Sequence, residues 1–133
     1  MRARAEVQIS AFLSNSPGVV AHLCEALREY GVNIRAVAVM DTVDIGTIRM
    51  VTDDVDTAKD ALQNVGAAFV ERPVLSVLIP NRPGELSRVA QQIASHGVNI
   101  EYFYASAAPE TSHCLAIFRV SDIERALKID FED

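Results

Sequence analysis

The sequence contains one pattern twice, at a constant offset of 66 residues. Asn15-Ser16-Pro17-Gly18 returns as Asn81-Arg82-Pro83-Gly84, and Gly31-Val32-Asn33-Ile34 returns unchanged as Gly97-Val98-Asn99-Ile100. No gap is needed between the two motifs, so both copies have kept the same spacing. Two copies are too few for a solenoid, and a chain of 133 residues has room for two small domains. The repeat therefore predicts a duplicated domain.

We predict that residues 1–72 form the first module and residues 73–133 the second. In the first, alternating apolar residues over 7–13 predict a strand, Pro17-Gly18 opens a helix, and Gly31 ends it. The remaining predicted elements are strands 32–40 and 47–51, a helix capped by Asp53 and Asp54 that ends at Gly66, and strand 67–72. This order is the split βαβ arrangement of an α+β fold, with a four-stranded antiparallel sheet and both helices on one face.

The second copy lacks a full last strand. Its predicted elements are strand 74–80, helix 83–96, strands 98–106 and 113–120, and a final helix to about residue 129. Ser121 and Glu124 have the spacing of a capping box at the start of that helix. Too few residues follow for a normal strand, so we expect the second sheet to be either three-stranded or completed by another chain.

Composition narrows the possible partners. The formal net charge is −6, which disfavours nucleic acid and anionic membrane surfaces. No signal peptide and no run of about 18 apolar residues is present, so we expect a cytoplasmic protein. Cys24 and Cys114 lie in patterned apolar segments and are expected to be reduced core thiols. No motif predicts catalysis, a metal site or a cofactor, and we expect the protein not to be an enzyme.

The turn before each first helix is the best candidate ligand site. A helix start leaves backbone N–H groups unpaired and carries partial positive charge, which suits a carboxylate. Gly18 and Gly84 lie there and allow close approach, while Asn15 and Asn81 add amides. Asn33 and Asn99 are candidates for the same pocket. Each motif also has a purely structural interpretation, in which its residues only form a turn and a helix cap. Duplication of the domain would by itself preserve such a motif.

The paired motifs resemble those of tandem ACT-domain proteins, a family of small βαββαβ regulatory modules that bind amino acids. The resemblance covers nearly the whole chain. It implies effector binding where two modules meet, at the first strand-to-helix loop, and sheets that join side by side. The residues it implicates are Asn15, Pro17, Gly18, Asn33, Ile34, Asn81, Pro83, Gly84, Asn99 and Ile100. We add Tyr102 and Tyr104, which share one strand face next to Asn99. They form a wall for a ligand side chain or a module interface, or else they are aromatic residues of the kind that any strand favours.

These observations predict a cytoplasmic regulator that binds a free amino acid or similar zwitterion, is a homodimer, and acts on a separate enzyme or transcription factor. Because no kinase, dehydrogenase or hydroxylase domain is attached, we expect the regulated protein to be a separate chain. The alternative is a ligand-independent interaction subunit that offers a sheet edge or helical face to its partner.

Overall fold

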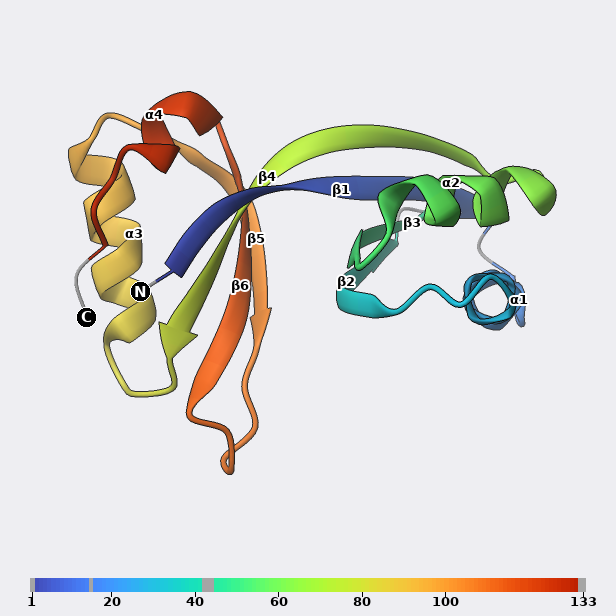
Figure 1. The fold of residues 1–133 in the computed structure, drawn as a ribbon, viewed down its shortest axis with the longest axis horizontal. Coiled ribbons are helices and arrows are strands. Elements are labelled where there is room, and N and C mark those ends of the chain that lie inside the picture. Colours follow the sequence, from blue (N-terminus) through green and yellow to red (C-terminus); the bar gives the residue numbers. More distant parts are fainter. Residues whose placement is uncertain (1, 15, 42–44, 132–133) are drawn as a thin grey trace. The chain divides into compact units, whose positions relative to one another are not determined.

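The computed structural model describes residues 2–14, 16–41 and 45–131. Each repeat has the order strand, helix, strand, strand, helix, and the elements are shown in Figure 1. Their bounds are β1 Arg2–Ser14, α1 Val19–Glu29, β2 Ile34–Asp41, β3 Ile45–Thr52, α2 Val55–Asn64, β4 Ala68–Pro80, α3 Glu85–Ser95, β5 Ile100–Ser106, β6 His113–Val120 and α4 Ile123–Leu127. The strand order is β2-β3-β1-β4-β6-β5. The predicted α+β fold with two split βαβ modules is confirmed.

The chain forms two compact units, and the boundaries of these units differ from the boundary between the two repeats. Residues 7–72 form one, here called the first unit, and residues 1–6 together with 73–133 form the other, the second unit. We had placed residues 1–6 in the first module. The reason for the difference lies in β1 and β4, which are each 13 residues long and contribute one part to each unit.

The second unit obtains its fourth strand from residues 2–6 of the same chain. Ala3 packs against the core of this unit, and the Ser76 hydroxyl on β4 donates a hydrogen bond to the Arg4 carbonyl at 3.5 Å. The expectation of a three-stranded sheet, or of a strand supplied by another chain, was therefore wrong. Ile129 and Phe131, in the segment where a last strand was missing, pack into the core instead.

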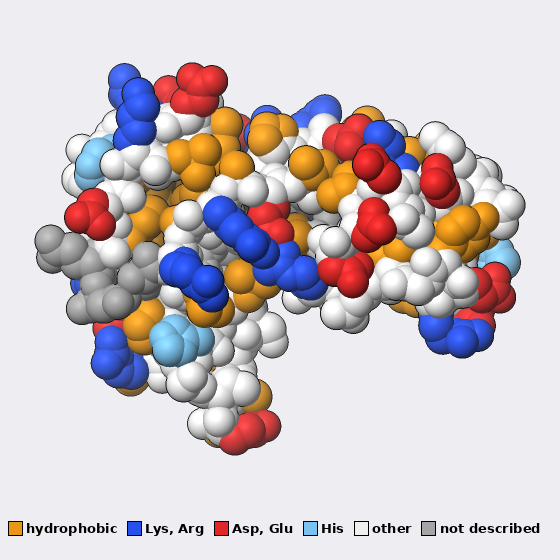
Figure 2. Space-filling view, in the orientation of Figure 1, with side chains coloured by type: hydrophobic (Ala, Val, Ile, Leu, Met, Phe, Trp, Pro, Cys, Tyr) orange, Lys and Arg blue, Asp and Glu red, His pale blue; other side chains and the backbone are white. Residues whose placement is uncertain are grey.

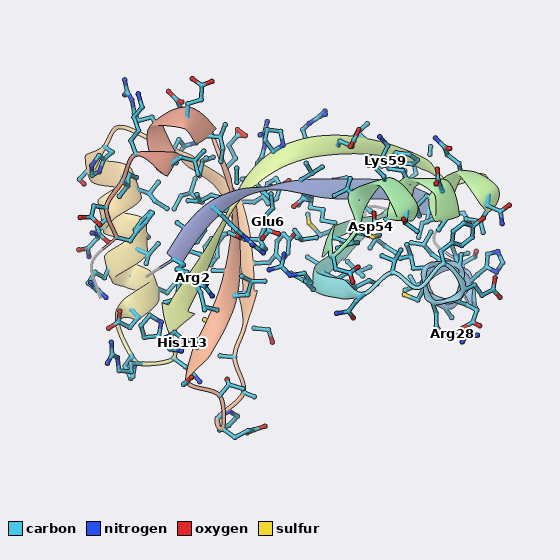
Figure 3. All side chains as sticks on the ribbon, in the orientation of Figure 1. Arg2, Glu6, Arg28, Asp54, Lys59 and His113 are labelled. Atoms are coloured by element: carbon cyan, nitrogen blue, oxygen red, sulfur yellow. The ribbon has the colours of Figure 1, made fainter. Side chains whose placement is uncertain are left out.

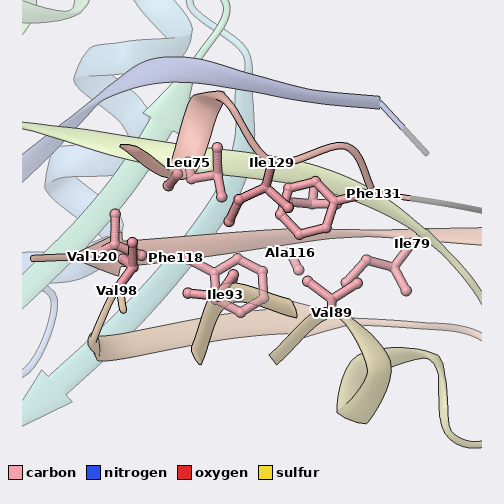
Figure 4. Packing of buried hydrophobic residues seen from close by; sticks show 12 residues of the cluster. Leu75, Ile79, Val89, Ile93, Val98, Ala116, Phe118, Val120, Ile129 and Phe131 are labelled. Atoms are coloured by element: carbon pink, nitrogen blue, oxygen red, sulfur yellow. The ribbon is translucent and has the colours of Figure 1, made fainter. Parts of the chain in front are cut away.

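Each unit has a core between its sheet and its helices. In the first, Leu23 and Leu27 of α1 and Leu62 of α2 pack on Ile9 and Met50 of the sheet. The second has the larger cluster shown in Figure 4. Its buried members are Leu75, Val77, Ile79, Val89, Ile93, Val98, Ala116, Phe118, Val120, Ala126, Ile129 and Phe131.

The apolar stripe of α1 is rotated relative to our prediction. We expected Val20, Leu23, Cys24 and Leu27 to face the core. The buried residues are Leu23, Ala26 and Leu27, whereas Val20 is 43% exposed and Cys24 is exposed. Cys24 is therefore not a core thiol, because the covered face of α1 lies one position further round the helix. Cys114 is partly buried against the core of the second unit, and both thiols are free.

No helix in the described ranges is long and apolar enough to cross a membrane.

Candidate functional site

Two turns of almost identical backbone geometry start the first helix of each repeat. Gly18 has φ of 84° and Gly84 has φ of 87°, in the left-handed region that favours glycine. Both are exposed and lie immediately before α1 and α3, and a Cβ at either position would meet no atom within 4 Å. The conformation of the backbone, rather than lack of space, therefore explains why glycine stands at both turns. Pro17 and Pro83 precede them on the surface.

The starts of α1 and α3 differ from the starts of the other two helices. Asp54 caps α2 by accepting hydrogen bonds from the Thr57 hydroxyl at 2.7 Å and the Thr57 N–H at 3.1 Å, and Asp122 caps α4 by accepting from the Arg125 N–H. The Thr57 hydroxyl and N–H hold the pKa of Asp54 below its usual 3.8. In contrast, α1 and α3 start at glycines and have no side-chain cap. The first N–H of each helix, from Val19 and Glu85, donates to a carbonyl of its own turn, at 3.4 Å to Ser16 and at 3.3 Å to Arg82. The N–H groups that follow in the first turn are the ones that a ligand carboxylate can bind.

The acid groups around α2 reinforce this difference. Figure 3 shows Asp54 at the start of α2, and Figure 2 shows Asp and Glu side chains gathered over this helix. A second anion would be repelled there. The predicted cap of α4 also needs correction, because Asp122 rather than Ser121 caps it.

Asn81 uses its side chain to fix a neighbouring loop. Its Nδ2 donates to the carbonyls of Ala108 at 2.9 Å and Thr111 at 3.0 Å, and its backbone N–H donates to Ser112. The contact arises because Pro80 pairs with His113, which Figure 3 labels at the start of β6. The turn before α3 and the loop between β5 and β6 therefore lie at the same end of the sheet. Both amide hydrogens of Asn81 serve this loop, which leaves its Oδ1 as the group to meet a ligand. Asn15 lies outside the described residues.

Asn33 lies at the opposite end of its sheet from the turn at Gly18. Ser14 pairs with Ile45 at the start of β3, whereas the Asn33 N–H donates to the Asp53 carboxylate, just beyond the end of β3, at 2.9 Å. Seven residues of strand separate Ile45 from Thr52, which corresponds to about 23 Å. The structure does not bring Asn33 to the turn pocket that we expected it to share.

The second unit repeats this arrangement. The Asn99 N–H donates to the Ser121 hydroxyl at 2.9 Å, at the far end of β6 from His113. Each repeat thus uses the backbone of this Asn to join the start of one strand to the end of its neighbour. Ile34 and Ile100, which follow, are half-buried and pack against the two cores.

Tyr102 and Tyr104 are both half-buried and share one face of β5, as predicted from strand alternation. They lie opposite Arg119 and Ile117 of β6. Phe103 points to the other face, where its ring stacks on Phe118 with centroids 5.4 Å apart. The two tyrosines are therefore on the sheet face that does not carry the Phe118 core.

A pocket lies beside the turn of the first unit, where the sequence predicts a ligand site, but most of its wall residues were not predicted. Its volume is about 210 Å³, and it is partly open to solvent. Its walls come from the end of β1, the first turns of α1 and the connection from α2 to β4, and they consist of Phe12, Leu13, Ser14, Val19, His22, Leu23, Val65, Gly66 and Ala67. His22 is exposed and lies one helical turn beyond Gly18. That spacing was the available signal, but walls from two other elements do not follow from it.

The charges at the two turns are different. In the second unit, Glu85 lies in the first turn of α3 and forms ion pairs with Arg88 at 2.6 Å and Arg82 at 3.2 Å. The hydrogen bond from Arg88, together with the charges of both arginines, holds the pKa of Glu85 below its usual 4.5. The first turn of α1 has no acidic residue. At the second turn the charge of Glu85 is balanced by the two arginines that pair with it, so an incoming carboxylate meets no net negative charge at either turn.

Within residues 2–14, 16–41 and 45–131, no three His, Cys, Asp or Glu side chains gather in a way that could hold a metal ion.

Comparison with known proteins gives the family. A family model described as an ACT domain pair matches residues 5–133. The chain belongs to the ACT domain pair family. Among solved structures, protein BT0572 from Bacteroides thetaiotaomicron is 28% identical, with a TM-score of 0.87 over 95% of this chain and 86% of that one. A search of curated proteins finds no match.

The ACT pair fold is also present in regulatory subunits of aspartate kinase. The ligand-free subunit from Thermus thermophilus is 20% identical, with a TM-score of 0.70 over 95% of this chain and 92% of that one. The subunit from Thermus flavus is 19% identical, with a TM-score of 0.63 over 96% and 92%. The similarity of this ACT pair to these subunits is one of fold.

Proposed function

We propose that this ACT pair is a regulatory protein that binds a free amino acid at the turn before α1, the turn before α3, or both. The observation that carries the proposal is the contrast between the capped helices α2 and α4 and the uncapped helices α1 and α3. N–H groups at an uncapped helix start bind a carboxylate. Membership of the ACT pair family and the fold shared with aspartate kinase regulatory subunits support a regulatory role rather than a catalytic one.

The binding residues proposed from the sequence remain Asn15, Pro17, Gly18, Asn81, Pro83 and Gly84, which surround the turns. Asn33, Ile34, Asn99 and Ile100 bind the same ligand only if a second ACT module presents them, because the register holds them at the far end of their own sheets. Tyr102 and Tyr104 lie on a sheet face and would contribute in the same way.

Two edge strands support self-association. β2 and β5 end the strand order, and β2 exposes Val37 and Val39 by 49% and 57%, while β5 exposes Phe103 by 47%. An edge strand with apolar side chains favours pairing with another chain. We therefore propose a homodimer. A ligand that binds one arrangement of its modules more tightly would shift the population towards it and so change how the dimer meets a separate enzyme or transcription factor.

The same exposed edge favours the alternative function, a ligand-independent interaction subunit. A thermal-shift screen of the twenty amino acids separates the two, since a ligand at one hundred times its Kd stabilises a fold by about 2.7 kcal/mol. Amino-acid binding predicts a rise in Tm with one or a few of them. No rise with any of the twenty would overturn it and leave the interaction subunit. Light scattering at several concentrations tests the dimer.

A further inference from the structure

The two long strands, β1 and β4, are inner strands in one unit and edge strands in the other. β3 pairs with residues 8–14 of β1, and β6 pairs with residues 75–80 of β4. Along the rest of their length β1 and β4 are neighbours of each other (Figure 1). Residues 2–6 are therefore an edge strand of the second unit, and residues 68–72 are an edge strand of the first.

The two edge strands are anchored by side chains of different size. In the first unit Phe69 packs against the core, and Glu71 forms an ion pair with Lys59 of α2 at 3.4 Å. In the second unit the side chain that packs against the core is that of Ala3. An apolar side chain stabilises roughly in proportion to the apolar area that it buries, so alanine holds its strand less tightly than phenylalanine. Three of the five side chains in residues 2–6 are exposed, namely Arg2, Arg4 and Ala5.

The part of β4 that residues 2–6 cover is an inner strand with a buried surface. Val74 and Val77 are fully buried, and Ser76 is 3% exposed. The Ser76 hydroxyl donates to the Arg4 carbonyl at 3.5 Å, which is long for a hydroxyl donor. If residues 2–6 leave, the backbone N–H and C=O groups of β4 that face them lose their partners, and another strand is needed to pair with them.

Pro73 gives the chain a place to change direction between the units. Proline has no N–H to donate to a neighbouring strand, and the pairing of β4 with β6 starts two residues later, at Leu75. The Pro73 carbonyl accepts a hydrogen bond from Arg119 of β6 at 3.0 Å, so Pro73 stays with the second unit. A change of backbone direction between Arg72 and Pro73 would separate the body of the second unit from residues 2–6 of the same chain.

We propose that residues 2–6 are a replaceable edge strand, and that in a dimer the second unit of each copy pairs with residues 2–6 of the other copy. The contacts with β4 are then the same as within one chain, because both copies have the same sequence. Exchange of an identical element is a low-cost route to a dimer.

Charge favours a second copy as the source of the strand. Residues 2–6 contain two arginines and one glutamate, whereas the whole chain has a net charge of −6. A basic segment that meets another copy therefore approaches an acidic protein. This exchange uses a different edge from β2 and β5, and it does not depend on amino-acid binding.

Two residues that meet across this contact allow a direct test. Ala3 and Leu75 both pack in the core of the second unit, so their neighbours Arg4 and Ser76 lie on the other face of the sheet. The hydrogen bond between Ser76 and Arg4 shows that the two positions are adjacent. Cysteines at both positions can therefore form a disulfide, whereas a cysteine in place of Ala5 lies on the opposite face from Ser76.

The test uses chains in which Cys24→Ser and Cys114→Ser remove the native thiols. A chain with both Arg4→Cys and Ser76→Cys should form a disulfide within itself, which shows that the geometry permits the bond. One chain with Arg4→Cys and another with Ser76→Cys are then mixed under mild oxidation and separated on a non-reducing gel. We expect a covalent heterodimer. The matched control replaces Arg4→Cys with Ala5→Cys, and it should give at least tenfold less.

The exchange is overturned if the double variant closes its own disulfide while the mixed single variants give no heterodimer, or give no more than the Ala5→Cys control. A second measurement does not depend on disulfide geometry. An immobilised chain that lacks residues 2–6 should retain purified wild-type chain at least threefold better than it retains more of the shortened chain, and equal retention also overturns the proposal. Neither experiment tests amino-acid binding, so failure here leaves that function in place.

Discussion

Replacing Gly18 with alanine tests whether backbone conformation explains the glycine at this turn. A left-handed backbone costs a residue with a Cβ about 1–2 kcal/mol. No atom lies within 4 Å of the new Cβ, so no steric clash adds to this cost. Alanine also restricts the unfolded chain, which offsets part of the loss. We therefore expect Gly18→Ala to lower the free energy of unfolding by about 1 kcal/mol.

Gly46 provides the matched control. It lies in β3 outside the left-handed region, and a Cβ there would make only ordinary contacts at 3.9 Å with the carbonyls of Leu13 and Met40. Gly46→Ala should therefore be neutral or stabilise the protein by up to about 1 kcal/mol. Gly18→Asn should cost less than Gly18→Ala, because asparagine adopts the left-handed conformation more readily.

Urea unfolding followed by far-UV circular dichroism measures these differences. For a unit of this size, about 1 kcal/mol corresponds to a change in Tm of about 4–8 °C. Gly84→Ala should show a similar loss, because its φ is nearly the same. Equal unfolding midpoints for Gly18→Ala and Gly46→Ala would refute the reasoning, since the positive φ would then carry no strain.

Three further predictions concern stability. Deleting residues 2–6 should lower the urea midpoint of the second unit, because its sheet loses an edge strand; an unchanged midpoint would contradict the shared strand. Ile93→Ala, at a fully buried position, should lower the free energy of unfolding by about 2–5 kcal/mol. Leu127→Ala, at a residue that is 43% exposed, should change it by less than about 0.5 kcal/mol. Equal losses for the two variants would contradict the assignment of Ile93 to the core. Hydrogen bonds from Arg28, Thr57 and Arg88 lower the pKa values of three carboxyl groups. The contribution of these groups to stability is therefore complete above their usual pKa values of 3.8–4.5, and it is lost as the pH falls below those values. They are Glu25, Asp54 and Glu85. Urea midpoints between about pH 6 and pH 3 should fall, and a flat profile would contradict this.

The fold followed from the sequence where the signals were local. Apolar periodicity, the Pro-Gly turns and the glycines that end helices are properties of neighbouring residues, and they predicted the order of elements in both repeats. The edge strand 2–6 depends on a partner about seventy residues away. Charged residues alternate with alanine in this segment, which is a weak signal for a strand. Ala3 packs against the core, whereas Ala5 is exposed.

Burial on α1 shows a second limit of periodicity. Val20, Leu23, Cys24 and Leu27 have ideal helical spacing, yet only Leu23 and Leu27 are buried. A wide apolar stripe indicates that a helix packs against something, but which edge of the stripe is covered depends on where the sheet and the other helix lie. That information comes from tertiary packing.

The candidate site was predictable at the turns and not beyond them. The place of the turns before the helices follows from the Pro-Gly pairs, whereas the positive φ of Gly18 and Gly84 was not predicted, because the residue before a helix usually has an extended backbone. The place of Asn33 depends on register, because a strand of seven or eight residues carries its two ends far apart. His22 and the walls from the α2–β4 connection needed the packed unit, as did the burial of Phe131 in the second core.

The division of β1 between two units has a consequence for how the chain acquires its structure. Residues 2–6 are synthesised before residues 7–72, but their partner strand, residues 73–80, is synthesised after them. A growing chain can complete the unit of residues 7–72 while the preceding segment still has nothing to pair with. The unit of residues 1–6 and 73–133 closes last, by pairing residues 73–80 with a segment that was synthesised before residues 7–72. Contacts at such long sequence separation slow folding, so this closure should be the late step when the protein matures.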